Sequence, residues 1–397
     1  MTKKRLIALL AVCSVATAML TTLFYISPHG RAVYATIAQR YGESPAAKLM
    51  KIETIVDSVY MGDYDKNHLT DRAASEYAAS IGDKYTLYLN STDFESMNSN
   101  LDGGYRGIGI QVGAKDGKIL IDSVMKDSPA EAAGLLSGDF IVSVNDVSYT
   151  ADELSEAVSA IKSVPQGESV KLGIERAGKL IEKNVTVSDV ELEYVKSTML
   201  DGTVGFVRID TFGNDVSEKF KSHINTLIEN GATSLVIDLR SNPGGTLDTV
   251  VDMIDFLVPE GIITTVKYRN GNEDVYKSDK SQINLPMCVL INENSASASE
   301  IMAAALSDYG KATLVGKNTY GKGVVQGVYS LGDGTGLRVT IARYYTPAGQ
   351  CIDGKGVAPD AEVDLPDGVK LKRFDATEGG DTQLAKAIDI LKNKSLY

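Results

Sequence analysis

Two short apolar runs, each followed at once by a turn and an amphipathic segment, limit what this chain can fold into. "SLVIDLR" (residues 234–240) leads through "SNPGG" into "TLDTVVDMIDFLV", and "MCVLI" (287–291) leads into "NENSASASEIMAAAL". An apolar run without alternation suits a strand that is buried on both faces of a parallel sheet. Strand–turn–helix repeats build such sheets and place functional groups at the carboxyl ends of the strands. The sequence therefore predicts an α/β domain here.

Residues 103–190 have a different period. "GGYRGIGIQV" alternates apolar side chains around glycines, "KDGK" is a hairpin signal, and Thr150 with Glu153 forms a capping box that opens a helix. The glycines indicate either a bulge or a loop whose N–H groups receive a carboxylate while a peptide adds as an extra strand. Together with "AGLLSGDFIVSVND", this stretch resembles a PDZ domain. By that resemblance, the residues that would hold a substrate's C-terminal end are Gly107, Ile108, Gly109 and Ile110.

The amino-terminal residues predict a membrane segment. Three basic residues at positions 3–5 precede 21 uncharged residues, 6–26, which are about enough to span a bilayer as a helix. Basic residues before the span predict that the rest of the chain is exported. "ATA" at 16–18 has the form of a signal-peptide cleavage site, but apolar residues continue past it, so we favour an uncleaved anchor. The expected location is the cell membrane, single-pass, with the catalytic domains outside the cytoplasm.

Composition excludes several classes of function. The net charge of −12 over 397 residues gives no basic face for nucleic acid. Three cysteines and three histidines form no disulfide framework and no cluster with metal-ligand spacing, so we expect neither a metal nor another cofactor. A Cys288–Cys351 bridge is not expected, because Cys288 lies in an apolar strand.

"NENSASASE" raises the question of whether one of its serines is a nucleophile. Ser297 and Glu300 have the spacing of a capping box, which by itself explains both residues. A serine also needs a base to remove its proton. None of the three histidines is suitably placed, and "GxSxG" does not occur, so a Ser-His-Asp triad is not expected. These histidines are His29, His68 and His223, the last expected on a solvent-exposed helix face.

A lysine is the other candidate base. "TYGKGVVQG" places Lys322 between two glycines at the start of an apolar strand, 25 residues after Ser297. Burial disfavours the ammonium form, so a buried lysine can accept a proton at neutral pH; the alternative is a solvated turn lysine. Gln326 follows on the same strand face and could orient the amine. Candidate oxyanion donors are the N–H groups of Gly244, Gly245 and Ala298.

The order of these motifs resembles that of the C-terminal processing peptidases, the tail-specific serine proteases that carry a PDZ domain. The matching blocks are "GFVRIDTF", "LVIDLRSNPGG", "VLINENSASASEIMAAALSDYGKATLVGKNTYGKGVVQ" and "YYTPAGQCIDGKGVAPD". The resemblance implies a Ser297 nucleophile, a Lys322 base oriented by Gln326, and an oxyanion hole made by Gly244 or Gly245 with Ala298. Structural support near the site is implied for Glu300, Asp308 and Thr319.

The resemblance also implies an α/β multidomain fold with a peptidase core of the ClpP/crotonase-like type. We expect polypeptide substrates bound through their C-termini, a PDZ domain that gates the site, and a homodimer built by the N- and C-terminal regions. The predicted divisions are an anchor at 1–30, a helical region at 31–102, the PDZ domain at 103–190, the peptidase domain at 191–365, and a linker with a final helix at 366–397.

Two positions depart from the family pattern. Asn294 replaces a glycine and tolerates the same left-handed turn. Lys162 stands at or near the place of an arginine that is proposed to link the PDZ domain to the active site, and an arginine's bidentate bonding does not transfer to lysine. Two other functions stay open at this point: a catalytically silent PDZ-containing envelope scaffold, and an envelope assembly protein that acts through its terminal helices.

Overall fold

The computed structural model describes residues 44–101, 104–200, 202–366, 369 and 380–394. The chain divides into two compact units, Met1–Arg72 and Ala73–Tyr397. In the first unit, helix α3 (Pro45–Val59) begins after Ser44, whose hydroxyl accepts a hydrogen bond from the N–H of Ala47 at 3.3 Å. Helix α4 (Lys66–Ala79) follows along the chain. The predicted anchor at residues 6–26 lies outside the described residues, and none of the described helices has the length and apolar character needed to cross a bilayer.

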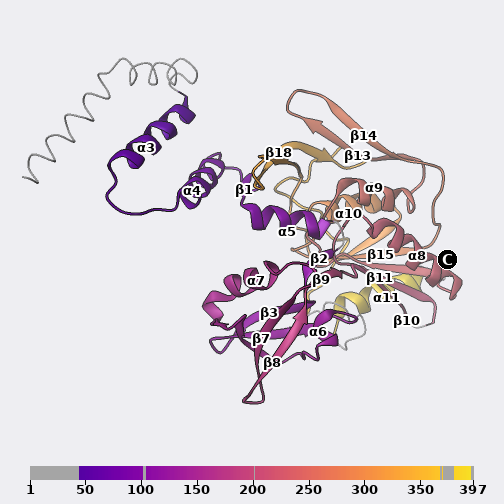
Figure 1. Ribbon diagram of the computed structural model, residues 1–397. Helices are drawn as coiled ribbons and strands as arrows, with labels where there is room; N and C mark the ends of the chain where they lie inside the picture. The colour runs from indigo at the N-terminus through magenta and orange to yellow at the C-terminus, as the bar shows by residue number, and fades with distance from the viewer. Residues whose placement is uncertain (1–43, 102–103, 201, 367–368, 370–379, 395–397) are drawn as a thin grey trace, which may run out of the picture. The chain divides into compact units, whose positions relative to one another are not determined.

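The central sheet of the second unit is parallel apart from one antiparallel edge strand (Figure 1). Its strands, in spatial order, are β10 (Val195–Leu200), β11 (Val204–Ile209), β12 (Ser234–Asp238), β15 (Met287–Ile291), β16 (Ala312–Gly316) and β19 (Ala361–Glu362). Strands β12 and β15 are buried along their whole length. The uninterrupted apolar runs in the sequence therefore form strands buried on both faces, as predicted.

Helices cover both faces of this sheet. Helices α8 (Val216–Glu229), α9 (Leu247–Asp255) and α10 (Ala298–Asp308) pack on the face that carries Leu235 and Ile237. The opposite face, with Val236, packs against the C-terminal helix α11 (Thr382–Lys394). Successive residues of β12 thus pack into two different hydrophobic cores, because side chains alternate between the two faces of a β-strand.

A second sheet has the order β1-β18-β13-β14, with β17 paired to β18. Its strands are β1 (Leu87–Leu89), β13 (Gly261–Tyr268), β14 (Glu273–Ser278), β17 (Val324–Ser330) and β18 (Gly336–Tyr345). Strand β1 lies in the stretch predicted to be helical, between α4 and α5 (Ser91–Leu101). It is a strand because its backbone completes the edge of β18, with Leu87 opposite Arg338. A partner about 250 residues away decides its structure, and a local pattern does not show that partner.

The β-rich module has its own hydrophobic core. Its main sheet consists of β3 (Ile110–Lys115), β4 (Lys118–Val124), β5 (Phe140–Val144), β6 (Val147–Ser148), β7 (Ser169–Arg176) and β8 (Lys179–Thr186). Strand β2 (Gly104–Gly107) pairs with β9 (Ser188–Glu191), and helix α7 (Leu154–Lys162) follows the predicted capping box. The predicted hairpin forms at Asp116 and Gly117, whose φ values of 52° and 73° suit a two-residue turn.

Candidate active site

Ser297 lies between the end of β15 and the first residue of α10, where the sequence placed it. Its backbone has φ 57° and ψ −115°, a conformation that a residue with a side chain rarely adopts. Such a conformation costs about 1–3 kcal/mol and persists only where the surroundings enforce it, most often at functional sites. The side chain is half-buried, and the flanking Ala296 and Ala298 are buried. The backbone thus holds one hydroxyl at a helix N-terminus.

The carboxylate of Glu300 enforces this geometry. The side chain is fully buried, with 0% exposure. Its Oε2 accepts the N–H groups of Ser297 and Lys322, both at 2.8 Å, and its Oε1 accepts the N–H of Gly321 at 2.7 Å and the Thr319 hydroxyl at 2.6 Å. One buried carboxylate therefore ties the backbone of the serine to that of the lysine. The capping-box spacing predicted the first bond but not the bonds to the segment of Lys322.

Lys322 sits in a crowded turn before β17. A Cβ atom added to Gly323 would lie 2.4 Å from the N atom of Asp353, so only glycine fits this close approach. The hydroxyl of Tyr344 donates to the carbonyl of Lys322 at 2.5 Å and to that of Ser297 at 3.2 Å. The Lys322 side chain is half-buried rather than a solvated turn lysine. Its backbone is thus fixed from two sides.

The charge state of Lys322 is shifted toward the neutral amine. The pKa of its amine is lowered to about 8, first by burial and second by the positive charge of Arg338, while the negative charge of Glu300 acts in the opposite direction. A lysine with a pKa near neutrality can take a proton from a hydroxyl group. The geometry and the charge state together suit a general base.

The residues just before strand β1 contact Lys322 and Arg338, and the sequence analysis did not predict these contacts. The amine of Lys322 lies 5.2 Å from the ring centroid of Tyr85, and the carbonyl of Tyr85 accepts the Nε–H of Arg338 at 3.2 Å. Lys84 lies 4.7 Å from the ring centroid of Tyr85 and 4.8 Å from that of Tyr320. These contacts place an aromatic ring against the amine of Lys322 and hold Arg338 near it.

Gln326 lies on β17 opposite Thr340 of β18. Its side-chain nitrogen is buried and, among the described residues, has no hydrogen-bond partner. The predicted bond between this amide and Lys322 is therefore not formed by that nitrogen. A buried, unpaired amide is costly, and one explanation for such a group is a catalytic role.

The "SNPGG" loop approaches the serine directly. A Cβ atom added to Gly244 would lie 2.9 Å from the Cβ of Ser297 and 3.0 Å from the N of Ala298. The N–H of Gly244 already donates to the side chain of Asn242 at 2.9 Å. Within the described parts of the chain, the N–H groups of Gly245 and Ala298 have no such partner. Two unpaired donors, one in the loop and one at the start of α10, thus lie beside Ser297.

The remaining predicted residues have identifiable surroundings. Asp308 accepts the N–H of Ala348 at 2.8 Å. His223 is half-buried, not exposed as expected, and its Nδ1 lies 2.7 Å from the hydroxyl of Ser197. Lys162 donates to the hydroxyl of Ser96 in α5 at 3.3 Å. Cys288 and Cys351 are both free thiols, as the apolar surroundings of Cys288 predicted.

Known proteins share this arrangement of domains. Residues 120–176 match the PDZ domain pattern, and residues 203–363 match peptidase family S41. The chain is 35% identical over 347 residues to the carboxy-terminal processing protease CtpA of Bacillus subtilis, covering 86% of this chain and 74% of the relative. It is 33% identical over 349 residues to CtpB of the same organism, covering 86% and 72%. The crystal structure of an S41 protease from Bacteroides fragilis superposes with a TM-score of 0.56 at 19% identity, covering 85% of this chain and 93% of that one.

These matches first define a class, the S41 peptidases with a PDZ domain. The extent and identity of the two Bacillus matches go further, and the chain belongs to the C-terminal processing proteases, which are serine-type enzymes. The family resemblance and the α/β fold with a PDZ domain, both expected from the sequence, are confirmed.

Proposed function

We propose that this protease cleaves polypeptides near their C-termini with a Ser297–Lys322 dyad. The Ser297 hydroxyl attacks the carbonyl carbon of the scissile bond while the neutral amine of Lys322 takes its proton. The resulting ammonium donates that proton to the leaving amine, and a water molecule then hydrolyses the acyl-enzyme. The observation that carries the proposal is the single buried carboxylate of Glu300, which bonds the backbone N–H groups of both residues at 2.8 Å.

The oxyanion would be bound by the N–H groups of Gly245 and Ala298. Their lack of other partners in the described structure favours them over Gly244, whose N–H is already bonded to Asn242. Preorganised donors of this kind supply about 3–4 kcal/mol each to transition-state binding. Gln326 is proposed as the orienting partner of Lys322 in the substrate-bound state, in which its buried amide would gain the partner that it lacks here.

The PDZ domain would bind the substrate's C-terminal end and gate the active site. The predicted loop is held from within the module, because the carbonyls of Ile108 and Gly109 accept the N–H groups of Ala130 and Met125 at 2.8 and 2.9 Å. Gly109 has φ 82°, and a Cβ atom there would lie 2.3 Å from that of Ser128. We retain Gly107, Ile108, Gly109 and Ile110 as the carboxylate-binding loop, and the domain divisions at residues 30, 102, 190 and 365.

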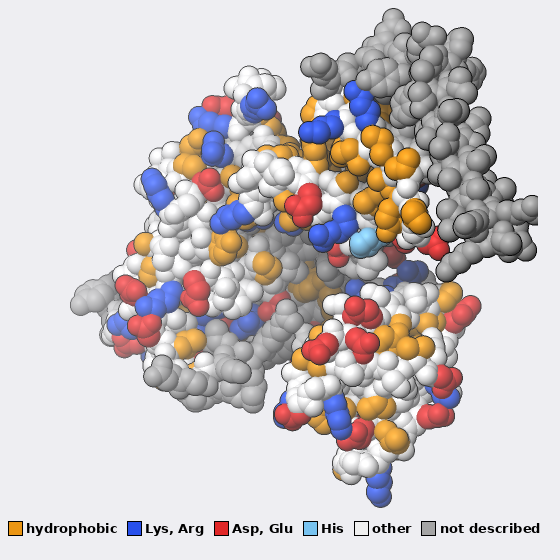
Figure 2. Space-filling model, turned by 90° about the vertical axis from the view of Figure 1, so that its left-hand side faces the viewer, with side chains coloured by type: hydrophobic (Ala, Val, Ile, Leu, Met, Phe, Trp, Pro, Cys, Tyr) orange, Lys and Arg blue, Asp and Glu red, His pale blue; other side chains and the backbone are white. Residues whose placement is uncertain are grey.

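Membrane attachment through residues 6–26 and a homodimer complete the proposal. Four large apolar side chains of α3 are exposed by 46–63%, and hydrophobic side chains gather in a patch on the face shown in Figure 2. The four exposed side chains of α3 are those of Leu49, Ile52, Ile55 and Val59. The apolar face of α11 is buried against the chain's own sheet, so we assign the dimer contact to α3. Analytical ultracentrifugation of the native chain and of Ile52→Glu tests this assignment. A native chain with the mass of a monomer would remove the dimer from the account, and a dimeric Ile52→Glu variant would remove α3 as the dimer contact.

The decisive experiment compares wild-type enzyme with Ser297→Ala on a protein substrate, with fragments identified by mass spectrometry. We expect fragments from the wild type that end near the substrate C-terminus, and none from the variant. A catalytically silent scaffold would bind the substrate's C-terminal peptide equally well in both forms and cleave it in neither. Cleavage by the Ser297→Ala form would exclude this serine as the nucleophile.

A further inference from the structure

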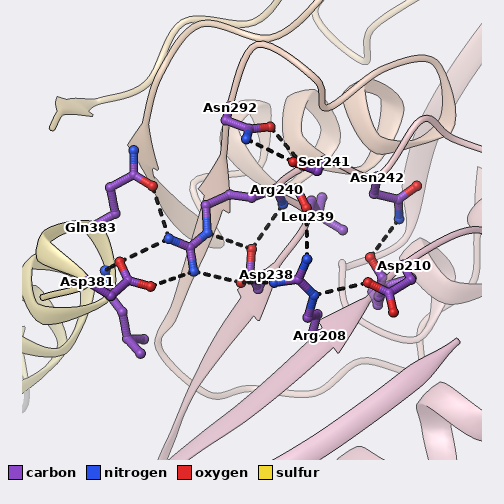
Figure 3. A network of polar contacts seen from close by, with 12 residues as sticks. Arg208, Asp210, Asp238, Leu239, Arg240, Ser241, Asn242, Asn292, Asp381 and Gln383 are labelled. Atoms are coloured by element: carbon purple, nitrogen blue, oxygen red, sulfur yellow. Dashed lines mark hydrogen bonds and ion pairs between the residues drawn. The ribbon is translucent and has the colours of Figure 1, made fainter. Parts of the chain in front are cut away.

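Arg240 directly precedes the "SNPGG" loop, and its buried guanidinium is surrounded by hydrogen-bond acceptors. The guanidinium makes four hydrogen bonds and one further close ion-pair contact, although the side chain is only 1% exposed. Asp238 accepts from Nε at 2.9 Å and from Nη2 at 2.7 Å. Asp381 accepts from Nη1 at 2.9 Å and pairs with Nη2 at 2.8 Å, while Gln383 accepts from Nη1 at 3.0 Å. Figure 3 shows the guanidinium between Asp238 on one side and Asp381 with Gln383 on the other.

Three of these five contacts come from Gln383 in the first turn of the C-terminal helix and from Asp381 just before it, about 140 residues away in the chain. Asp381 precedes α11, and its Oδ1 also caps the helix by accepting the N–H of Leu384 at 2.9 Å. Gln383 donates to the carbonyl of Val363 at 2.9 Å, which fixes its amide orientation. The apolar residues of α11 that press it onto the sheet are Leu384, Ala387 and Leu391. Helix α11 thus presents two fixed acceptors to one buried arginine.

Arg240 directly precedes Ser241–Gly245, the loop that approaches Ser297. Its carbonyl lies 3.5 Å from Nη2 of Arg208. Ser241 has φ 59°, and its N–H donates to the side chain of Asn292 at 2.8 Å. The carbonyl of Asn242 accepts the N–H of Ala296 at 3.0 Å. A displacement of Arg240 would move residues 241–245 and with them the unpaired N–H of Gly245.

We propose that Asp381 and Gln383 are positioning residues for the oxyanion hole, which act by holding Arg240 and the loop Ser241–Gly245 in place. The start of helix α11 then positions the active site, in addition to packing on one face of the sheet. This inference rests on the proposed use of Gly245 as an oxyanion donor. The guanidinium is charged at every accessible pH, so without these acceptors it is held by Asp238 alone, and the unpaired Nη1 draws it toward water and displaces the loop.

Two variants remove the acceptors with little change of shape. Asp381→Asn keeps an oxygen for the helix cap but places an NH₂ group against Arg240, and Gln383→Met removes the amide. Two controls lie on the same helix: Asp389→Asn makes the same chemical change at an exposed position, and Leu391→Ala loosens the packing of α11 without touching Arg240. Circular dichroism shows which variants are folded.

The test measures binding of a peptidyl boronic acid, whose tetrahedral adduct on Ser297 mimics the oxyanion, against binding of an uncleaved peptide. We expect Asp381→Asn and Gln383→Met to bind the boronate at least tenfold more weakly and to lose kcat in proportion. Peptide affinity, KM and the pH dependence set by Lys322 should stay as in wild type. The two controls should match wild type in all of these.

Three outcomes separate the possibilities. An active wild type whose Asp381 and Gln383 variants keep full boronate affinity would overturn the positioning role. An equal loss in Leu391→Ala would also overturn it, because general loosening of α11 would then explain the effect. A wild type that neither cleaves peptides nor binds the boronate would instead refute the proposed dyad chemistry, before any variant is compared.

Discussion

Glu300→Gln is the substitution for which the structure gives the sharpest expectation. The carboxylate accepts four hydrogen bonds and donates none, whereas glutamine offers one oxygen and two N–H donors. The least costly orientation keeps the oxygen on Ser297 and Lys322 and turns the NH₂ toward Thr319, whose hydroxyl can accept. The N–H of Gly321 then loses its acceptor in a fully buried position.

The magnitude follows from these bonds. An orphaned buried N–H costs about 1–3 kcal/mol, and two bonds that lose their charged acceptor lose about half their strength, or about 1–2 kcal/mol together. Removing a buried charge offsets part of this sum. We therefore expect the free energy of unfolding to fall by about 2–3 kcal/mol. Because the contact that holds the strained backbone of Ser297 loses its charged acceptor and is weakened, we also expect kcat to fall at least tenfold, as a misplacement of about 1 Å does.

Urea unfolding followed by tyrosine fluorescence and circular dichroism measures the first quantity, and peptide cleavage measures the second. Glu273→Gln is the matched control, because Glu273 forms an exposed ion pair with Lys267, a kind that contributes about 0–1 kcal/mol. Loss of the Glu300 charge should also lower the pKa of Lys322 further and move the pH profile of any residual activity toward acid. A Glu300→Gln enzyme with wild-type stability and kcat would refute this reasoning.

Three further predictions concern the same site. Arg338→Met should raise the pKa of Lys322 and shift the rise of kcat/KM to higher pH, whereas Arg338→Lys should not; equal profiles would exclude the charge effect. Lys322→Met should abolish cleavage yet stabilise the fold at pH 7. The pKa of the lysine is about 8 in the folded protein and 10.5 in the unfolded chain. Burying the charged lysine therefore lowers the free energy of unfolding fully below pH 8, and this loss disappears as the pH rises toward 10.5. A difference in urea midpoint between Lys322→Met and wild type that is the same at pH 7 and pH 10 would contradict this. Gly244→Ala should push against Ser297 and lower kcat about 100-fold, while Gly231→Ala, at φ 96° in open space, should leave kcat unchanged.

Local patterns were sufficient for much of the fold and for the position of Ser297 at a helix start. The apolar runs marked β12 and β15, and the turn after β15 predicted a serine at a helix start. Two glycines around Lys322 indicated a crowded backbone, which the close approach of Gly323 to Asp353 confirms. These features depend on residues a few positions apart, so the local spacing in the sequence is enough to predict them.

The missed features depend on contacts between distant segments. Tyr85 reaches the amine of Lys322 only because β1 joins the edge of β18. Asp381 lies 141 residues after Arg240 in the chain, directly before a helix for which the sequence indicates only an amphipathic pattern. Neither residue type nor spacing indicates such partners, because they are determined by how the sheets and helices pack.

The most direct measurement is the pH dependence of the reaction of Ser297 with a fluorophosphonate, which forms a covalent serine adduct without needing a leaving amine. With wild-type enzyme, the rate should rise about tenfold per pH unit through the neutral range and level off above about pH 8, where Lys322 is neutral. Lys322→Met, checked for folding by circular dichroism, should not react at a comparable rate at any pH. A labelling rate in the wild type that is constant from pH 6 to about pH 9, or an adduct on another residue, would contradict the account.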